Sequence, residues 1–312
     1  MNQSSNQVKT KGMQKSDTLA IFYLVLPFTF FGIMLTSLDD NVFIYSIGQL
    51  FGAIFFAQSF ILLHELGHRS FFKSNKMNTA FGYFFSILVF IPYYNWLEVH
   101  ELHHKWTGWR DKDPTTEKTF SDRFTPFQEN LINFSWKFYI PLFTIGYRFG
   151  IYWKTEKLKR HLSKKSYTKC LVEMFCYGIF YFLLILLFPG FCLSILPALY
   201  LSFIITDILS LSQHSHIEMP ISNGEEVVPL KYKDQSKYSR SLVFSPIISE
   251  YFLFNFNFHE HHHAYPGLPC YHLSKVQNQL INTYSFLPWL KKVKSMKGVD
   301  FIFKTDPNRH GF

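Results

Sequence analysis

The chain has 312 residues, of which 48% are hydrophobic, 20% are aromatic and only 17% are charged, and its formal net charge is +9. So large an apolar fraction excludes an intrinsically disordered protein, and four cysteines are too few to cross-link a chain of this length into a disulfide scaffold. The positive charge by itself suggests nucleic acid or an anionic membrane surface as a partner, so its distribution along the chain has to separate the two.

The first elements are two apolar stretches behind a basic tail. Residues 1–18 form this tail, and residues 19–312 are predicted to form one membrane domain. A helix needs about 20 mostly apolar residues to cross a bilayer, and residues 19–38 and 42–63 meet that length without Lys or Arg. Because the gap between them is so short, they predict a helical hairpin. The first stretch is too long for a signal peptide and has no small-residue cleavage pattern, which favours a retained signal anchor.

A second pair of apolar stretches, residues 170–188 and 191–210, is joined by Pro189-Gly190 and predicts a second hairpin. All 31 Lys and Arg lie outside the two hairpins. By the positive-inside rule, this distribution puts both termini and the segment between the hairpins in the cytoplasm. The expected fold class is therefore an all-α integral membrane protein, with four transmembrane helices in two hairpins, interfacial helices and a cytoplasmic helical cap.

Two further apolar stretches are ambiguous. Residues 79–96 are about long enough to span, but they end in an aromatic cluster, and aromatic side chains favour the headgroup region. Residues 132–153 are interrupted by Lys137, Pro141 and Arg148. Both stretches are predicted to be helices that dip into the cytoplasmic leaflet or lie on it.

Most of the 14 histidines fall into four short groups. Their spacings of three and four residues put the imidazoles on one face of a helix, where they can chelate a metal. One isolated H-x-x-x-H is more often a pair of surface histidines, but four such groups together argue against unrelated exposed side chains. The three remaining histidines, His161, His272 and His310, are predicted to be structural or solvated. The groups are His64 and His68; His100, His103 and His104; His214 and His216; and His259 with His261, His262 and His263.

This number of imidazoles indicates more than one metal ion, because a single zinc takes three or four ligands. Imidazole suits Zn, Cu, Fe and Ni, so the ligand type alone does not name the metal. A neutral, nitrogen-rich shell beside a lipid phase suits a centre that activates O2 for an apolar substrate. Histidines that share a site must lie on one side of the bilayer, so residues 79–96 must return to the side that they leave.

The four groups and their flanking residues resemble the histidine boxes of the membrane fatty acid desaturases. His64-Glu65-Leu66-Gly67-His68-Arg69 resembles the first box, and His100-Glu101-Leu102-His103-His104 with Thr107-Gly108 resembles the second. Gln213-His214-Ser215-His216 with Met219-Pro220 is similar to a segment of the acyl-lipid branch. His259 to His263, followed by Pro266-Gly267-Leu268-Pro269 and Tyr271-His272-Leu273, resembles the third box and its tail. The resemblance covers roughly residues 19–290 and does not identify the substrate.

The resemblance implies an enzyme that uses O2 and a diiron centre to introduce a double bond into a fatty acyl chain bound to lipid, CoA or a carrier protein. Electrons would come from a separate protein, a ferredoxin or a cytochrome b5, because no haem-binding H-P-G-G motif is present. His216 and His261 fill variable positions and are expected to be incidental or to lie behind the ligands. The iron ligands and catalytic residues that the resemblance implies are His64, His68, His100, His103, His104, His214, His259, His262 and His263.

Several residues near the boxes have two interpretations each. Asp207, inside the fourth predicted span, could support a ligand or face water at a helix end. Three carboxylates could orient imidazoles or be solvated, namely Glu65, Glu101 and Glu260. Three indoles could line an acyl tunnel, although interfacial anchoring is favoured, namely Trp96, Trp106 and Trp109.

Other function classes explain less of the sequence. An intramembrane zinc protease would use H-E-x-x-H with Glu65 as the general base, but it also needs an aspartate ligand in an L-D-G tripeptide, which this sequence lacks. A metal transporter should carry its ionisable ligands within the spans, where only Glu173 and Asp207 fall. Within the superfamily, a lipid hydroxylase or a carotenoid ketolase stays open.

Overall fold

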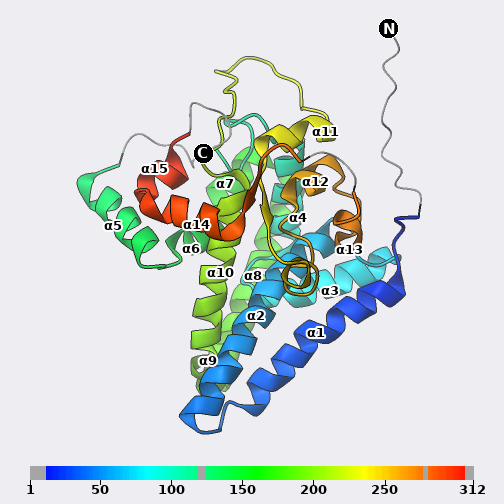
Figure 1. Ribbon diagram of the computed structural model, residues 1–312, viewed down its shortest axis with the longest axis vertical. Helices are drawn as coiled ribbons and strands as arrows, with labels where there is room; N and C mark the ends of the chain where they lie inside the picture. The colour runs from blue at the N-terminus through cyan, green and yellow to red at the C-terminus, as the bar shows by residue number, and fades with distance from the viewer. Residues whose placement is uncertain (1–11, 118–123, 277–279, 306–312) are drawn as a thin grey trace.

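The computed structural model describes residues 12–117, 124–276 and 280–305, and helices dominate it (Figure 1). Within these ranges, four helices are long and apolar enough to cross a membrane, which confirms the all-α membrane class, and each of them overlaps one of the four predicted stretches. One difference is functionally important. The second spanning helix continues past residue 63 to Gly67, so that its last turn carries His64. The four helices are α1 (Asp17–Thr36), α2 (Val42–Gly67), α8 (Lys164–Leu187) and α10 (Leu196–His214).

Helix α2 is the centre of the membrane part and packs against both α1 and α10. Asn41 caps its start, because the side-chain oxygen of Asn41 accepts hydrogen bonds from the first-turn amides of Phe43 and Ile44. Such a cap satisfies amides that have no partner inside the helix. Its neighbours approach closely because Gly52 has no side chain, and a Cβ there would overlap Met34 of α1 and Ala198 of α10. Small residues at helix crossings are typical of membrane bundles.

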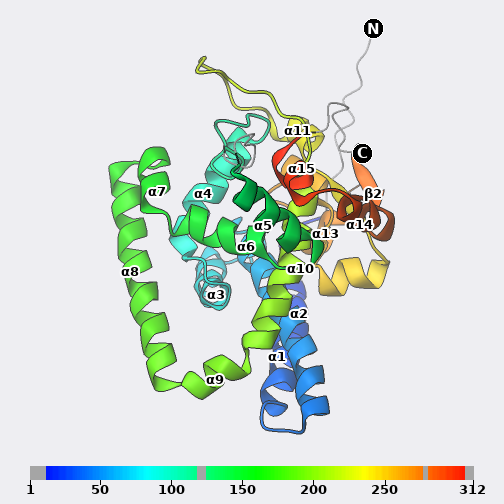
Figure 2. The ribbon, with the colours of Figure 1, turned by 90° about the vertical axis from the view of Figure 1, so that its left-hand side faces the viewer.

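The second pair of spans is not the packed hairpin that the sequence predicts. A short helix, α9 (Pro189–Ser194), separates α8 from α10, and Figure 2 shows α8 standing apart from α10 with α9 joining them at one end. The chain turns here because Pro189 can begin a helix but cannot continue the preceding one. The fourth predicted stretch therefore starts in α9 and not in the spanning helix. Most of α8 is exposed in the protein alone, as expected of a helix that faces lipid.

The ambiguous stretch at residues 79–96 is broken into two helices. They are α3 (Asn75–Leu88) and α4 (Tyr93–Trp106), and their axes meet at 102°. Phe90 has a φ of 59° in the short connection, and Pro92 caps α4. The bend turns the chain back, so that His100 on α4 comes within 2.8 Å of His68 at the end of α2, measured between the Nε2 atoms. The chain therefore returns to the side that it left.

The stretch at residues 132–153 forms several short helices. They begin with α5 (Pro126–Lys137), which Thr125 and Gln128 close with a reciprocal capping box. Next come α6 (Leu142–Tyr147), a π-helical turn (Arg148–Tyr152) and α7 (Thr155–His161). In Figures 1 and 2, α5 and α6 lie near the end of the spans at which α2 and α10 terminate, far from the turn between α1 and α2.

The C-terminal part covers the end of the spans at which α2 and α10 terminate (Figure 1). Its two short strands are parallel, with Ser241 opposite Thr283. Glu260 ties the second strand to the helix that carries the third box, because its carboxylate accepts hydrogen bonds from the amides of Ile281 and Asn282. The elements are α11 (Tyr232–Gln235), a 3-10 turn (Ser236–Tyr238), β1 (Ser241–Val243), a second π-helical turn (Ile248–Phe252), α12 (His259–Ala264), α13 (Cys270–Leu273), β2 (Thr283–Ser285), α14 (Phe286–Ser295) and α15 (Gly298–Phe303).

Candidate metal centre

The structure brings nine histidines together in two groups, and in each group the ring nitrogens lie within 4.8 Å of one another. The nine are the residues that the sequence analysis singled out as ligands. All except His68 and His214 are buried, and those two are partly exposed. The five-histidine group contains His64, His68, His100, His104 and His262, and the four-histidine group contains His103, His214, His259 and His263.

Helix periodicity divides each H-x-x-H-H motif between the two groups. On α4, His100 and His104 are one turn apart and join the five-histidine group, while His103 points to the other. On α12 the division is reversed, because His259 and His263 join the four-histidine group and His262 crosses to the five-histidine group. Helices α4 and α12 thus serve both groups, whereas α2 serves only the first and α10 only the second.

The distances between imidazole nitrogens fit metal ligation. In the five-histidine group, His100 Nε2 lies 2.8 Å from that of His68 and 3.1 Å from that of His104, which is 3.0 Å from that of His262. In the four-histidine group, the Nε2 atoms of His214 and His259 are 2.9 Å apart. Those of His259 and His263 are 3.1 Å apart, and those of His214 and His263 are 3.2 Å apart. Two nitrogens at about 2.1 Å from one metal and at right angles are about 3.0 Å apart, whereas tetrahedral angles give about 3.4 Å.

The buried polar atoms give a second test of this fit. His64 Nε2 is buried and has no hydrogen-bond partner among the described residues, although it points into the five-histidine group. An unpaired buried nitrogen costs free energy unless something binds it. Burial also holds the pKa of His259, His262 and His263 well below the ordinary value, so these imidazoles are neutral at pH 7. Neutral imidazole is the form that binds a metal.

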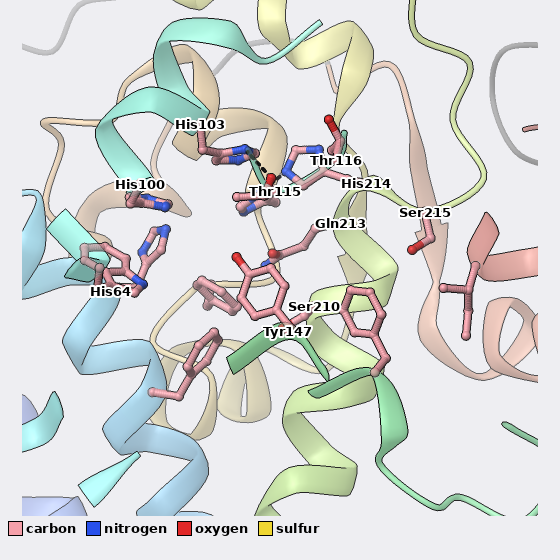
Figure 3. Close-up of a pocket in the computed structure, with 16 residues that line it drawn as sticks. His64, His100, His103, Thr115, Thr116, Tyr147, Ser210, Gln213, His214 and Ser215 are labelled. Atoms are coloured by element: carbon pink, nitrogen blue, oxygen red, sulfur yellow. Dashed lines mark hydrogen bonds between the residues drawn. The ribbon is translucent and has the colours of Figure 1, made fainter. Parts of the chain in front are cut away.

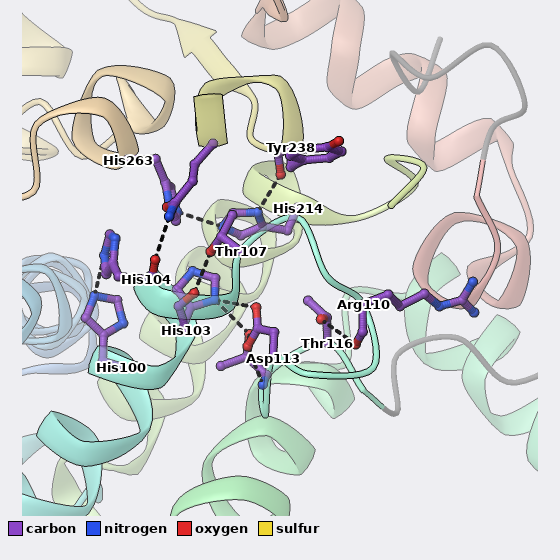
Figure 4. Close-up of polar contacts among 12 residues, drawn as sticks. His100, His103, His104, Thr107, Arg110, Asp113, Thr116, His214, Tyr238 and His263 are labelled. Carbon is purple, nitrogen blue, oxygen red and sulfur yellow. Dashed lines mark hydrogen bonds and ion pairs between the residues drawn. The ribbon is translucent and has the colours of Figure 1, made fainter. Parts of the chain in front are cut away.

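A buried carboxylate and a hydroxyl orient His103 from behind (Figure 4). Asp113 Oδ2 accepts a hydrogen bond of 2.7 Å from His103 Nδ1, and Thr115 Oγ1 lies 3.0 Å from the same nitrogen. Burial alone would raise the pKa of Asp113, but the interaction with His103 and the hydrogen bonds from His103 and Thr115 outweigh it, and the pKa lies below its ordinary value. A proton fixed on Nδ1 leaves Nε2 free to bind a metal.

Other imidazoles in the site are oriented in the same way. His214 Nδ1 donates to the backbone carbonyl of Tyr238 at 2.8 Å, and His263 Nδ1 donates to Gln235 Oε1 at 3.1 Å. Glu65 Oε1 accepts from His64 Nδ1 at 3.1 Å, while its Oε2 accepts from the backbone amide of Cys270. Because both oxygens of Glu65 have partners, the residue orients His64 and is not poised as the general base that a zinc protease would need.

The other predicted carboxylates and Asp207 have different positions. Glu101 is exposed, and the carboxylate of Glu260 accepts hydrogen bonds from the amides of Ile281 and Asn282 and from the Thr283 hydroxyl at the second strand. Asp207 accepts a hydrogen bond from the backbone amide of Thr144, in the first turn of α6, and therefore caps that helix. Neither interpretation of Asp207 from the sequence anticipated this contact.

Trp96 corrects the expectation that the indoles are interfacial anchors. Its side chain is 2% exposed and stacks on His100, with the ring centroids 4.2 Å apart. Gly67 makes room for it, because a Cβ on Gly67 would overlap the indole. Trp106 and Trp109 are partly exposed, and the indole nitrogen of Trp109 donates to the carbonyl of Val228. A long-range contact of this kind cannot be anticipated from the aromatic composition of the stretch.

The remaining described histidines lie outside both groups. His216 has a φ of 63° and directs Nδ1 to the carbonyls of Asp300 and Lys304 in the C-terminal part. His261 is buried with Nδ1 facing the carbonyl of Leu273. His161 pairs with Glu117, and His272 faces the carbonyl of Gln14. His310 lies outside the described residues.

A cavity opens directly beside both groups (Figure 3). Five of the nine histidines line it, two from the five-histidine group and three from the other. The rest of its wall is mixed, with six apolar or aromatic residues and five polar ones, namely Thr115, Thr116, Ser210, Gln213 and Ser215. The histidines are His64, His100, His103, His214 and His259, and the aromatic residues are Phe60, Trp96, Phe143, Tyr147 and Phe256.

Sequence reasoning missed the residues that orient the ligands. Asp113 and Thr115 follow the second box in a segment without regular periodicity, and Gln235 and Tyr238 come from another part of the chain. The one available signal was Asp113 itself, a carboxylate shortly after a histidine box, because metal-bound imidazoles commonly donate to a carboxylate.

The chain matches the model of the fatty acid desaturase family over residues 41–289. It is 30% identical to an sn-1 acyl-lipid omega-3 desaturase (ferredoxin) from Nostoc over 35% of this chain and 32% of that protein. A protein of the same description from Synechocystis is 32% identical over 33% of this chain and 28% of its own length. A Delta(12) fatty acid desaturase from Mortierella alpina is 38% identical over 22% of this chain and 18% of its own length. These alignments span about a third or less of the relatives. Because the family match covers most of the chain, including all nine histidines, the protein belongs to the fatty acid desaturase family.

Proposed function

We propose that the protein is a membrane enzyme that introduces a double bond into a fatty acyl chain. The observation that carries the proposal is the pair of histidine groups beside one cavity that is also lined by aromatic side chains. The proposal has support from the relatives, whose names describe acyl-lipid and Delta(12) desaturases. The overall reaction takes one hydrogen from each of two adjacent methylenes, and with two electrons and two protons O2 is reduced to two waters.

The nine histidines are proposed to hold two iron ions, one in each group. Bound iron would supply the centre at which O2 is activated. The residues of the chain itself keep the imidazoles neutral by burial and fix their orientation from behind. Trp96, Phe60 and Phe256 exclude water from the cavity next to the ligands.

The electron donor and the orientation in the membrane complete the proposal. Two of the relatives are described as ferredoxin-dependent, so a ferredoxin is the favoured donor, with a cytochrome b5 as the alternative. The positive-inside rule supports a cytoplasmic position for the termini and for the histidine end of the spans. A soluble donor could then reach the side on which the centre lies.

The test is expression in a host that lacks the activity, followed by mass spectrometry of its lipids and iron analysis of the purified protein. We expect a new double bond and two irons per chain. His216→Ala is the matched control, since His216 neighbours His214 but faces the C-terminal part, and it should keep both. Absence of a double bond in protein that carries iron and has a working donor would refute desaturation, and a hydroxyl or keto product would select the hydroxylase or ketolase alternative.

A further inference from the structure

A second cavity adjoins the histidine-lined cavity and leads away from it. Four side chains line both cavities and form the wall that the two share: Thr115, Phe143, Tyr147 and Ile302. Tyr147 projects into the first cavity between the histidines and α10 (Figure 3). The second cavity continues between α5, α6 and the first π-helical turn, where its wall is mostly apolar and includes Ile132, Trp136, Ile140 and Ile151.

Two glycines keep the outer end of the second cavity open. Gly146 and Gly150 both line it and are exposed, and a Cβ on either would meet no atom within 4 Å. Neither has a positive φ, so the backbone does not require glycine at these positions. The side chains beside them, Ile145 and Phe149, are 39% and 50% exposed. The mouth therefore has an apolar rim.

The neighbouring helix α5 exposes an apolar face. Phe127, Leu131, Phe134 and Phe138 are 76%, 43%, 54% and 55% exposed. Their spacing of four, three and four residues puts them on one side of the helix. A helix with such a face lies at a membrane surface and buries that face among the lipids. The mouth of the second cavity thus opens beside a surface that suits hydrocarbon and does not suit water.

We infer that the acyl chain of a membrane lipid enters sideways from the bilayer through this mouth, and that Gly146 and Gly150 set the width of the passage. The inference rests on the proposed function and adds the route and the carrier. The chain would pass Ile132 and Ile151 and reach the histidine-lined cavity between Phe143 and Tyr147.

The charged residues of the passage agree with a lipid whose headgroup stays outside. Lys154 lines the cavity with a side chain that is 46% exposed and lies 3.9 Å from the exposed carboxylate of Glu156, an exposed pair that a lipid phosphate could replace. Lys157 is buried and pairs with Glu117 at 3.3 Å. The carboxylate of Asp207 accepts the Thr144 amide. A soluble acyl carrier would instead require a polar docking surface around the opening, where the structure has Ile145 and Phe149.

The test narrows the mouth without touching the metal ligands. Gly146→Phe and Gly150→Phe would fill the passage, and Gly178→Phe is the matched control, because Gly178 is also helical and exposed, with no atom within 4 Å of a Cβ, but lies on α8. Each protein is placed in lipid nanodiscs with a phosphatidylcholine that carries a diazirine on its acyl chain. After illumination, the cross-linked residues are mapped by mass spectrometry, and turnover, iron content and thermal unfolding are measured in parallel.

We expect wild type and Gly178→Phe to cross-link at Ile132, Phe143 and Ile151. In Gly146→Phe and Gly150→Phe, cross-linking at Phe143 should fall at least fivefold and turnover about tenfold. Their iron content and unfolding temperature should stay unchanged. The inference is overturned if they behave like Gly178→Phe, if the labels map instead to α8, or if a diazirine acyl-CoA labels the passage and the lipid does not. If wild type cross-links as expected but forms no double bond, the proposed function fails and the lipid passage stands.

Discussion

The five-histidine and four-histidine groups share the two H-x-x-H-H boxes, and the two boxes divide their histidines between the groups in opposite ways. In each H-x-x-H-H box, the outer pair one turn apart serves one group, and the inner histidine crosses to the other. The groups differ because α2 adds a second such pair, His64 and His68, whereas α10 adds only His214. His216 does not form a pair with His214. It lies only two residues beyond His214, which is not a helical turn, and its positive φ directs its side chain toward the C-terminal part.

The groups also differ in how their imidazoles are fixed. In the four-histidine group, hydrogen bonds from Nδ1 orient His103, His214 and His263. In the five-histidine group, Glu65 orients His64, and His100 is positioned by stacking on Trp96. Each group also holds one imidazole whose Nδ1 has no partner among the described residues, His104 in the first and His259 in the second. One group depends on polar contacts and the other depends more on packing, so they should respond to different substitutions.

The largest expected effect comes from removing one ligand of each group. His262→Ala and His263→Ala alter neighbouring residues of one helix that belong to different groups. Each should lower bound metal from two ions to about one per chain and reduce turnover by more than about 100-fold, since even residues behind the ligands contribute 10- to 100-fold. Metal analysis and lipid mass spectrometry check this. Loss of both metals from either variant would show that the groups are not separate sites.

Asp113→Asn should weaken only the four-histidine group. The amide keeps the shape but not the charge that receives the His103 proton, and we expect metal affinity to fall by about 10- to 100-fold at that site. His262→Ala disables the five-histidine site, so metal titration of Asp113→Asn in that background measures the four-histidine site alone. In a His263→Ala background the same titration measures the five-histidine site alone. An equal loss in both backgrounds would contradict the assignment of Asp113 to one group.

Gly67→Ala should disturb the five-histidine group through packing. The added methyl overlaps the Trp96 indole that stacks on His100, and overpacking of this kind costs about 1–3 kcal/mol. Thermal unfolding in detergent, together with metal titration in the His263→Ala background, checks it. Adding Trp96→Leu should recover part of the stability, and a Gly67→Ala protein as stable as wild type would argue against the tight contact.

The smallest effect on the metal centre is expected from a contact outside both groups. Glu117 pairs with Lys157 and His161, and although burial opposes its charge, these partners lower its pKa to about 2. Its folded-state pKa lies below the ordinary 4.5, so its stabilisation is present above pH 4.5 and is lost as the pH falls toward 2. Glu117→Gln should cost on the order of 2 kcal/mol at pH 7 without changing metal stoichiometry. Unfolding measured against pH tests this, and a dependence that persists in the variant would contradict it.

The local pattern of the sequence predicts the four spans and the nine histidines of the two groups, because hydropathy and helical spacing are local properties. It does not predict the orienting residues, since Gln235 and Tyr238 meet the site only through tertiary folding. The burial of Trp96 and the separation of α8 from α10 depend likewise on contacts between distant segments. Asp207 shows the limit well, because its role as a helix cap requires α6 to lie beside α10.

The close crossing of α2 and α10 at Gly52 and Ala198 has a mechanical consequence. His64 lies 12 residues beyond Gly52 on α2, a lever arm of about 18 Å at 1.5 Å per residue. A rotation of about 3° at this pivot would move His64 by roughly 1 Å relative to His214 at the end of α10. Because spanning helices tilt to match bilayer thickness, a change in the thickness of the surrounding membrane that rotated α2 against α10 at this crossing would alter the spacing between the two histidine groups.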